Sequence, residues 1–152
     1  FRDSLFSPNL CGDAVYRKCF YLLNMITQVT KGIKVSVQTT FEGTFFKNYK
    51  MHYAFGYTIT IENQGEEAVQ LLSRHWEVFA SLKELETIDG EGVIGKKPVF
   101  KPGKSHTYSS GCLLASPIGA MKGHYDMTNL STSEHIQVEV PTFKLAAPFA
   151  LN

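Results

Sequence analysis

The sequence has little of what marks a disulfide-rich, membrane-spanning or nucleic-acid-binding protein. Three cysteines among 152 residues are too few for a disulfide scaffold or a cysteine-based zinc site, so we expect a protein of the reducing cytoplasm. No apolar run approaches the roughly 20 residues that a membrane-spanning helix needs. The formal net charge of +1 lacks the basic excess that is typical of nucleic-acid binding. We therefore expect no membrane insertion and no nucleic-acid partner.

A helical repeat of apolar residues is also missing, and alternation with a period of two takes its place. Residues 32–38 alternate apolar and polar side chains, and the odd positions of 53–61 are all apolar, as on one face of a longer strand. Further strands are predicted at residues 69–80, 82–88, 105–110, 121–127, 135–140 and 143–151, with Pro141 ending the pairing before the last. The pattern predicts an all-β, antiparallel two-sheet β-sandwich of about seven to eight strands, fibronectin type III- or immunoglobulin-like, with Trp76 in its core.

The most informative motif is a GxGxxG sequence that two lysines follow. Its members are Gly90, Gly92, Gly95, Lys96 and Lys97. A dinucleotide-binding Rossmann turn must open a helix, but Pro98 and a second turn at residues 101–104 leave no room for one. The segment is therefore predicted to be a loop between strands. Two interpretations stay open. In the first, the amides and lysines of the loop, with Arg74 at its rim, hold a phosphate or pyrophosphate. In the second, the glycines only permit tight turning.

Four side chains are candidates for a divalent metal site. His75 and Glu77 share one face of a predicted strand, and His124 and Asp126 do the same on another. If the two strands are neighbours, four nitrogen and oxygen ligands converge, a set that suits cobalt or zinc better than magnesium. The alternative is that these are ordinary surface residues and that the protein has no cofactor.

Nucleophilic catalysis has little support in the sequence. Cys112 has no evident histidine partner and is typical of a buried small side chain. The Ser109-Ser110-Gly111 sequence lacks the GxSxG pattern of a nucleophile elbow. We therefore expect a protein without enzymatic activity.

Aromatic residues gather in a stretch that is predicted to be a loop. They are Phe41, Phe45, Phe46 and Tyr49. These side chains either cover the end of the sandwich or form an exposed apolar patch for a protein contact. The apolar tail at residues 145–151 offers a sheet edge to a partner strand or to a second copy, so a homodimer is a further option.

Residues 1–24 differ from the rest, since they hold two of the three cysteines and show no clear alternation. We hypothesise that Met25 is the native start and that residues 1–24 are a non-native leader; a genuine extension is the alternative. Residues 25–152 are predicted to form the domain.

Several motifs in this domain resemble the ApaG family. They are QLLSRHW at 70–76, GEGVIGKKPV at 90–99, PG at 102–103, YSSG at 108–111, GAMKGHY at 119–125, VPTF at 140–143 and PFALN at 148–152. The resemblance covers residues 25–152 and implies a fibronectin type III-like sandwich. It also implies an association with cobalt resistance and magnesium efflux, and a protein-binding role as in related domains. It brings no catalytic residues.

The residues and the resemblance together predict a non-enzymatic binding module with a protein partner and a link to divalent-cation homeostasis. The alternative is a protein that binds phosphate, pyrophosphate or a nucleotide at residues 90–97, including a version that hydrolyses the ligand.

Overall fold

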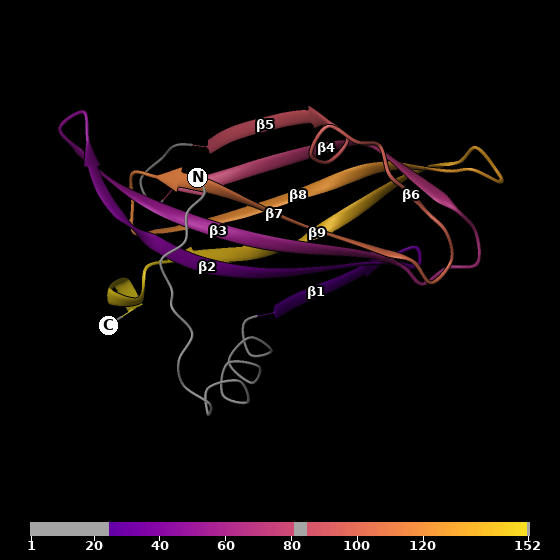
Figure 1. Cartoon of the computed structure of the whole chain (residues 1–152), viewed down its shortest axis with the longest axis horizontal. Helices are drawn as coiled ribbons and strands as arrows, with labels where there is room; N and C mark the ends of the chain where they lie inside the picture. The colour runs from indigo at the N-terminus through magenta and orange to yellow at the C-terminus, as the bar shows by residue number, and fades with distance from the viewer. Residues whose placement is uncertain (1–24, 81–84, 152) are drawn as a thin grey trace, which may run out of the picture.

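The computed structural model describes residues 25–80 and 85–151, which form two antiparallel sheets packed face to face (Figure 1). The strands among these residues are β1 (Met25–Thr30), β2 (Ile33–Lys47), β3 (Lys50–Asn63), β4 (Val69–Ala80), β5 (Leu85–Glu91), β6 (Val99–Phe100), β7 (Ser105–Leu114), β8 (Ile118–Asn129) and β9 (His135–Ala146), and the 3-10 helix η1 (Pro148–Leu151) follows. The predicted leader at residues 1–24 and the first part of the predicted strand 82–88 lie outside the described residues.

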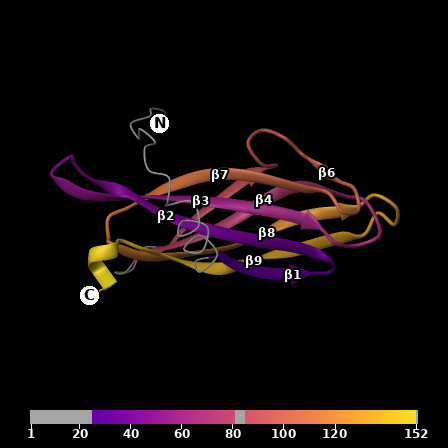
Figure 2. The same ribbon diagram turned by 60° about the horizontal axis from the view of Figure 1, so that its bottom comes forward.

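The two sheets have simple strand orders. The first is β1-β2-β3-β7, and the second is β5-β4-β8-β9, with β6 pairing with the start of β4. β1 lies alongside β9, so the two sheets meet along that side (Figure 2). The predicted two-sheet antiparallel sandwich is confirmed. The described residues contain nine strands rather than seven or eight, because β1 and the two-residue β6 are short additions.

The C-terminal part of the chain differs from the prediction in two places. β9 (His135–Ala146) continues through Pro141 instead of ending there. The β8–β9 register shifts between Met121 and Gly123, and Pro141 lies at this bulge, where its missing amide hydrogen interrupts no regular pairing. Pro148–Leu151 forms η1 and not the end of an edge strand.

The aromatic stretch that was predicted to be a loop is the outer half of a long hairpin. β2 and β3 stay paired as far as Lys47 and Lys50, and only Asn48 and Tyr49 connect them. The register shifts next to Gly43, which marks a bulge. Because of this bulge, and because aromatic residues lie on both faces of the hairpin, its sequence does not show the alternation of apolar and polar residues that is typical of a strand. Figure 1 shows the hairpin extending past the other strands at one end of the sandwich.

Trp76 lies in the core between the sheets, as predicted, and is only 3% exposed. Its ring centroid lies 5.8, 6.1 and 6.0 Å from those of Tyr57, Tyr125 and Phe143. Gly123 faces Trp76 across the β4–β8 pair, and a Cβ at this glycine would come within 2.9 Å of the indole ring. The same Cβ would lie only 2.1 Å from the His75 carbonyl oxygen, so the close approach of the β4 backbone, with the indole beside it, explains the second glycine of the GAMKGHY motif. Among residues 25–80 and 85–151, no helix has the length and apolar character to cross a membrane.

Candidate functional site

The GxGxxG segment forms a bend between β elements, as its flanks predict. β5 ends at Glu91, and Val93 and Lys96 then bridge each other across a two-residue turn. The turn residues Ile94 and Gly95 have φ angles of 50° and 71°, the backbone pattern of a tight hairpin turn. The next element is the short strand β6 and not a helix, so the segment is not a Rossmann turn.

Each glycine of the segment has a structural reason of its own. Gly90 leaves space for a guanidinium, because a Cβ there would lie 2.8 Å from Arg74. Gly92 has a φ angle of 60°, and a Cβ there would lie 2.1 Å from the Lys96 carbonyl oxygen. Gly95 has open space around it and is favoured only by its positive φ angle.

Three of the amides that could form an anion nest already have backbone partners. Gly92 N donates to the Leu72 carbonyl oxygen at 2.8 Å. Val93 N and Lys96 N each donate to the other residue's carbonyl oxygen, at 2.8 and 3.2 Å. These three amides are therefore not available to an anion. Lys97 Nζ lies 3.6 Å from the Glu91 carboxylate, and both side chains are largely in solvent.

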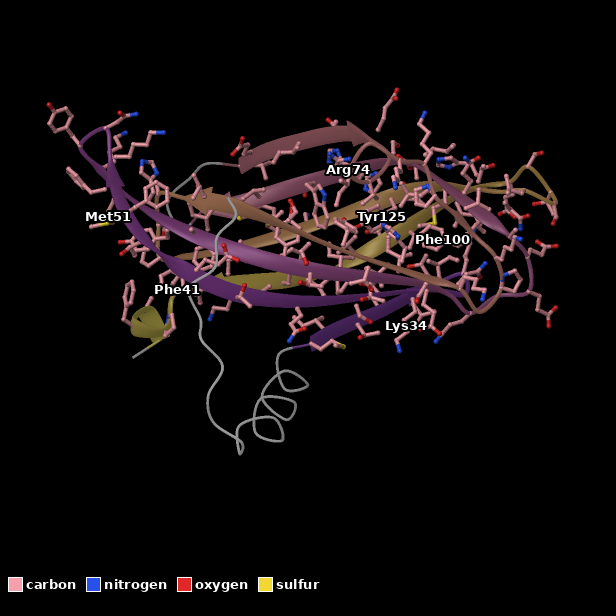
Figure 3. All side chains as sticks on the ribbon, viewed as in Figure 1. Lys34, Phe41, Met51, Arg74, Phe100 and Tyr125 are labelled. Carbon is pink, nitrogen blue, oxygen red and sulfur yellow. The ribbon has the colours of Figure 1, made fainter. Side chains whose placement is uncertain are left out.

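Arg74 fastens the glycine segment to β4. Its Nη1 donates to the carbonyl oxygens of Glu91 and Gly92, at 3.2 and 2.6 Å. Among the described residues, no carboxylate forms an ion pair with Arg74. Figure 3 shows Arg74 between β4 and the segment that follows β5. The guanidinium therefore has a structural role and also a charge without an acidic partner in this part of the chain.

The Arg74 charge also acts on three tyrosines inside the sandwich. Burial raises the pKa values of Tyr57, Tyr108 and Tyr125, and the guanidinium opposes this rise. The Tyr108 and Tyr125 hydroxyls share a hydrogen bond in the interior. The three phenols therefore stay neutral in the folded protein at physiological pH.

The four candidate metal ligands do lie on neighbouring strands, as the metal hypothesis requires. His75 faces His124 in the β4–β8 register, and their stacked rings have centroids 4.9 Å apart. Glu77 and Asp126 lie on opposite sides of this histidine pair. Within residues 25–80 and 85–151, no group of three or more His, Cys, Asp or Glu side chains has an arrangement that could hold a metal ion.

The carboxylates beside the histidines already have other partners. Lys122 Nζ lies 3.0 Å from one Glu77 oxygen, while His75 Nε2 is 3.9 Å from the other. Ser73 donates to Asp126 at 2.9 Å. These contacts orient both carboxylates within the polar face of the sheet.

The nearest partner of His75 is Asp89, which the sequence analysis did not single out. The Asp89 carboxylate lies 2.5 Å from His75 Nδ1, because β5 pairs with β4 and puts the two residues opposite each other. An open groove of about 400 Å³ lies over this pair, and Arg74, His124 and Asp126 also line it. The groove therefore mixes a guanidinium, two imidazoles and carboxylates, and is not a simple anion site.

Cys112 is partly buried on β7, facing the core. Burial, with a smaller contribution from the Glu86 charge, raises the pKa of the Cys112 thiol to about 11. A thiol with a raised pKa is a poor nucleophile at neutral pH, which agrees with the structural role predicted for this residue.

The aromatic stretch divides into covering and exposed side chains. Phe41 covers the end of the sandwich, with ring centroids 5.4 Å from Phe55 and 5.9 Å from Phe149. Phe46 and Tyr49 are 66% and 94% exposed. Both outcomes that the sequence left open are therefore realised, at different positions of the same hairpin.

We call residues 45–52 the hairpin tip. Met51 lies opposite Phe46 and is 46% exposed, a position that the sequence analysis missed because Met51 is not aromatic. Phe45 stacks on His52 with ring centroids 5.5 Å apart, and His52 Nε2 lies 3.3 Å from the Lys47 carbonyl oxygen. These contacts join the two strands of the tip, while Phe46, Tyr49 and Met51 face solvent.

The fold and these surfaces define a small β-sandwich of the kind that presents binding sites on its loops and sheet faces.

The family model of the ApaG domain matches residues 44–129. Protein ApaG of Methylobacterium radiotolerans is 41% identical over 119 residues, covering 78% of this chain and 91% of that protein. Protein ApaG of Pseudomonas aeruginosa is 45% identical over 100 residues, covering 66% and 79%. The X-ray structure of a Northeast Structural Genomics Consortium target is 36% identical with a TM-score of 0.73, covering 77% of this chain and 88% of that one. The chain belongs to the ApaG domain family.

Proposed function

We propose that this chain is a non-catalytic binding module of the cytoplasm that acts through protein contacts. The observation that carries the proposal is the hairpin tip, where Phe46, Tyr49 and Met51 expose apolar surface at the end of a paired two-stranded ribbon. Aromatic and methionine side chains are enriched in protein interfaces, and ordered anchors lose little entropy when they bind.

The proposed role is linked to divalent-cation homeostasis, which the resemblance to ApaG proteins implies. We assign this link to the protein partner, since Glu77 and Asp126 already contact Lys122 and Ser73. A module that binds a transporter or its regulator needs no metal site of its own.

The proposal is tested by capturing partners with the tagged full chain from a lysate of the source organism. The test variant is Phe46→Ser with Met51→Ser. The matched control is Ile94→Ser with Leu130→Ser, because these side chains are 65% and 48% exposed but lie elsewhere. We expect the captured proteins to disappear with the tip variant and to persist with the control. Equal capture by both variants would show that the tip is not the contact site.

A second candidate function is the binding of a phosphate-containing ligand in the groove beside residues 90–97. It is favoured by Arg74, whose guanidinium lines the groove without an acidic partner among the described residues, and by Lys96 and Lys97 nearby. Gly90, Gly92 and Gly95 would shape the segment. Three carboxylates in the same groove, those of Asp89, Glu91 and Asp126, oppose this function.

Thermal unfolding with pyrophosphate, ATP or cobalt separates the two candidates, because a ligand that binds only the folded state raises Tm. A pyrophosphate shift that is lost with Lys96→Ala and Lys97→Ala would favour the anion function. A cobalt shift that is lost with His75→Ala and His124→Ala would revive the metal site, together with Glu77 and Asp126. No shift with any of the three ligands is the result that protein binding predicts.

A further inference from the structure

The order of side chains along the hairpin tip is its most informative property. The connecting residues Asn48 and Tyr49 come first, then the facing pair Lys47 and Lys50, and the facing pair Phe46 and Met51 lies behind them. The end of the hairpin is therefore an aromatic residue with two cations directly behind it and apolar surface further back.

The facing lysines have an unfavourable arrangement in the free protein. Like charges directly opposite each other destabilise a strand pair. No acidic residue occurs in the sequence between Glu42 and Glu62, and no ion pair within the described residues involves Lys47 or Lys50. An anionic group that approaches this pair from outside would relieve the repulsion.

Tyr49 is also unusual for its backbone conformation. Its φ angle of 61° lies in the left-handed region, and two-residue β-hairpin turns normally have glycine at this position. The turn between β1 and β2 follows that rule with Gly32, and the turn after β5 follows it with Gly95. A strained residue whose side chain is almost wholly exposed contributes little to the fold, which points to a contact made by the phenol ring.

The same order of side chains argues against a lipid surface. Interfacial anchors place their apolar side chains deepest and keep lysines at the level of the headgroups. Here Lys47 and Lys50 would enter a bilayer before Phe46 and Met51. A pocket in a protein can instead place acidic groups deep inside and apolar groups at its rim.

We infer that the hairpin tip inserts Tyr49 into an acidic pocket on a partner protein. In this complex, carboxylates of the partner pair with Lys47 and Lys50, while Phe46 and Met51 pack on an apolar rim. The inference rests on the proposed function and adds the chemistry of the partner to it. It requires only the tip, so the groove over His75 and His124 plays no part.

The test is photo-crosslinking from position 49. The full chain carries p-benzoylphenylalanine in place of Tyr49, is irradiated in lysate of the source organism, and the crosslinked peptides are identified by mass spectrometry. We expect one dominant protein, crosslinked within a segment rich in Asp and Glu. The background control carries the same crosslinker at Leu130, which is exposed on another loop.

Charge variants make the test specific. Lys47→Glu with Lys50→Glu should lower the crosslink yield at least about tenfold, as expected when two charge pairs become repulsive. Lys47→Arg with Lys50→Arg should keep most of it. The control Lys96→Glu with Lys97→Glu carries the same charge change on the other turn and should leave the yield unchanged.

The outcomes separate the inference from the proposed function. A protein crosslink that charge reversal leaves unchanged, or one in a basic segment, overturns the acidic pocket and leaves protein binding intact. Crosslinks to lipid or to a second copy of this chain overturn the inference as well. If position 49 gives no crosslink above the Leu130 background and capture does not depend on the tip, both the inference and the proposed function are contradicted.

Discussion

Two tight turns of this molecule have nearly the same backbone and opposite surroundings. Ile94 and Gly95 have φ angles of 50° and 71°, and Asn48 and Tyr49 have 52° and 61°. The first turn folds back onto β4 through Arg74 and through backbone hydrogen bonds. The second ends a free hairpin and exposes its largest side chain to solvent.

The difference shows that a conspicuous sequence motif can be used within the fold while a less conspicuous turn is left exposed. Gly90 and Gly92 permit close packing of the chain on itself, and Gly95 permits a positive φ angle, so all three glycines serve the fold. Tyr49 is locally unfavourable, yet little of it is buried. Tyr49 combines this strain with the turn position that glycine usually fills and with the facing lysines behind it, and this combination motivates the proposed external contact.

The largest expected effect is on the first turn. Gly92→Ala should destabilise the fold by about 3 kcal/mol or more, because its Cβ would overlap the Lys96 carbonyl oxygen at a positive φ angle. Urea unfolding followed by tryptophan fluorescence measures this change. A loss below about 1 kcal/mol would mean that this turn is much looser than its hydrogen bonds indicate.

Arg74→Met should destabilise the fold by about 2 kcal/mol, because the Gly92 carbonyl oxygen is left buried without its charged donor. The same unfolding experiment measures it, with Lys96→Met as the control of an exposed cation. An unchanged free energy of unfolding would show that Arg74 does not fasten the segment to β4 and would leave it free for a ligand.

Tyr49→Gly should stabilise the fold by about 0.5–1 kcal/mol, since glycine adopts the left-handed conformation without strain and little packing is lost. This corresponds to an increase in Tm of about 2–4 °C. The reciprocal control is Gly95→Ala in the other turn, where a Cβ meets no atom within 4 Å but the φ angle is positive. It should lower Tm by a similar amount. Destabilisation by Tyr49→Gly would mean that Tyr49 serves the fold.

The smallest effect concerns the facing lysines. Lys47→Ala should stabilise the free protein by about 0.2–0.5 kcal/mol at low ionic strength, because Lys50 no longer faces a like charge. The gain should vanish in about 1 M salt, where charges are screened within a few ångströms. A gain that salt does not reduce would point to strand propensity as its source.

The fold was predictable from the sequence because burial of one sheet face imposes a period of two, as in residues 53–61. The absence of a Rossmann helix followed from Pro98, whose ring fixes the backbone. The path of β9 was not predictable, since whether Pro141 ends a strand depends on a bulge opposite Lys122. The hairpin tip was also missed as a strand pair. Neither face of the tip covers the core, so apolar and polar residues do not alternate there, and Phe45 and Phe46 follow each other directly.

The candidate sites show a similar division. The facing of His75 and His124 could be anticipated only if β4 and β8 were known to pair, and the contact of His75 with Asp89 depends on a third strand. Tyr49 was among the aromatic residues singled out in the sequence, but its positive φ angle follows only from the two-residue connection between paired strands, which requires positive φ angles at both positions. That signal becomes visible only once the register of β2 and β3 is known.

The most direct measurement is the affinity of the crosslinked partner, once purified, for the wild-type chain, Tyr49→Phe and Tyr49→Gly. Tyr49→Phe should bind within about threefold of wild type, and Tyr49→Gly should bind at least about thirtyfold more weakly, as for a buried aromatic anchor worth 2 kcal/mol or more. Equal affinities for wild type and Tyr49→Gly would contradict the account, because the strained residue would then serve neither the fold nor the contact.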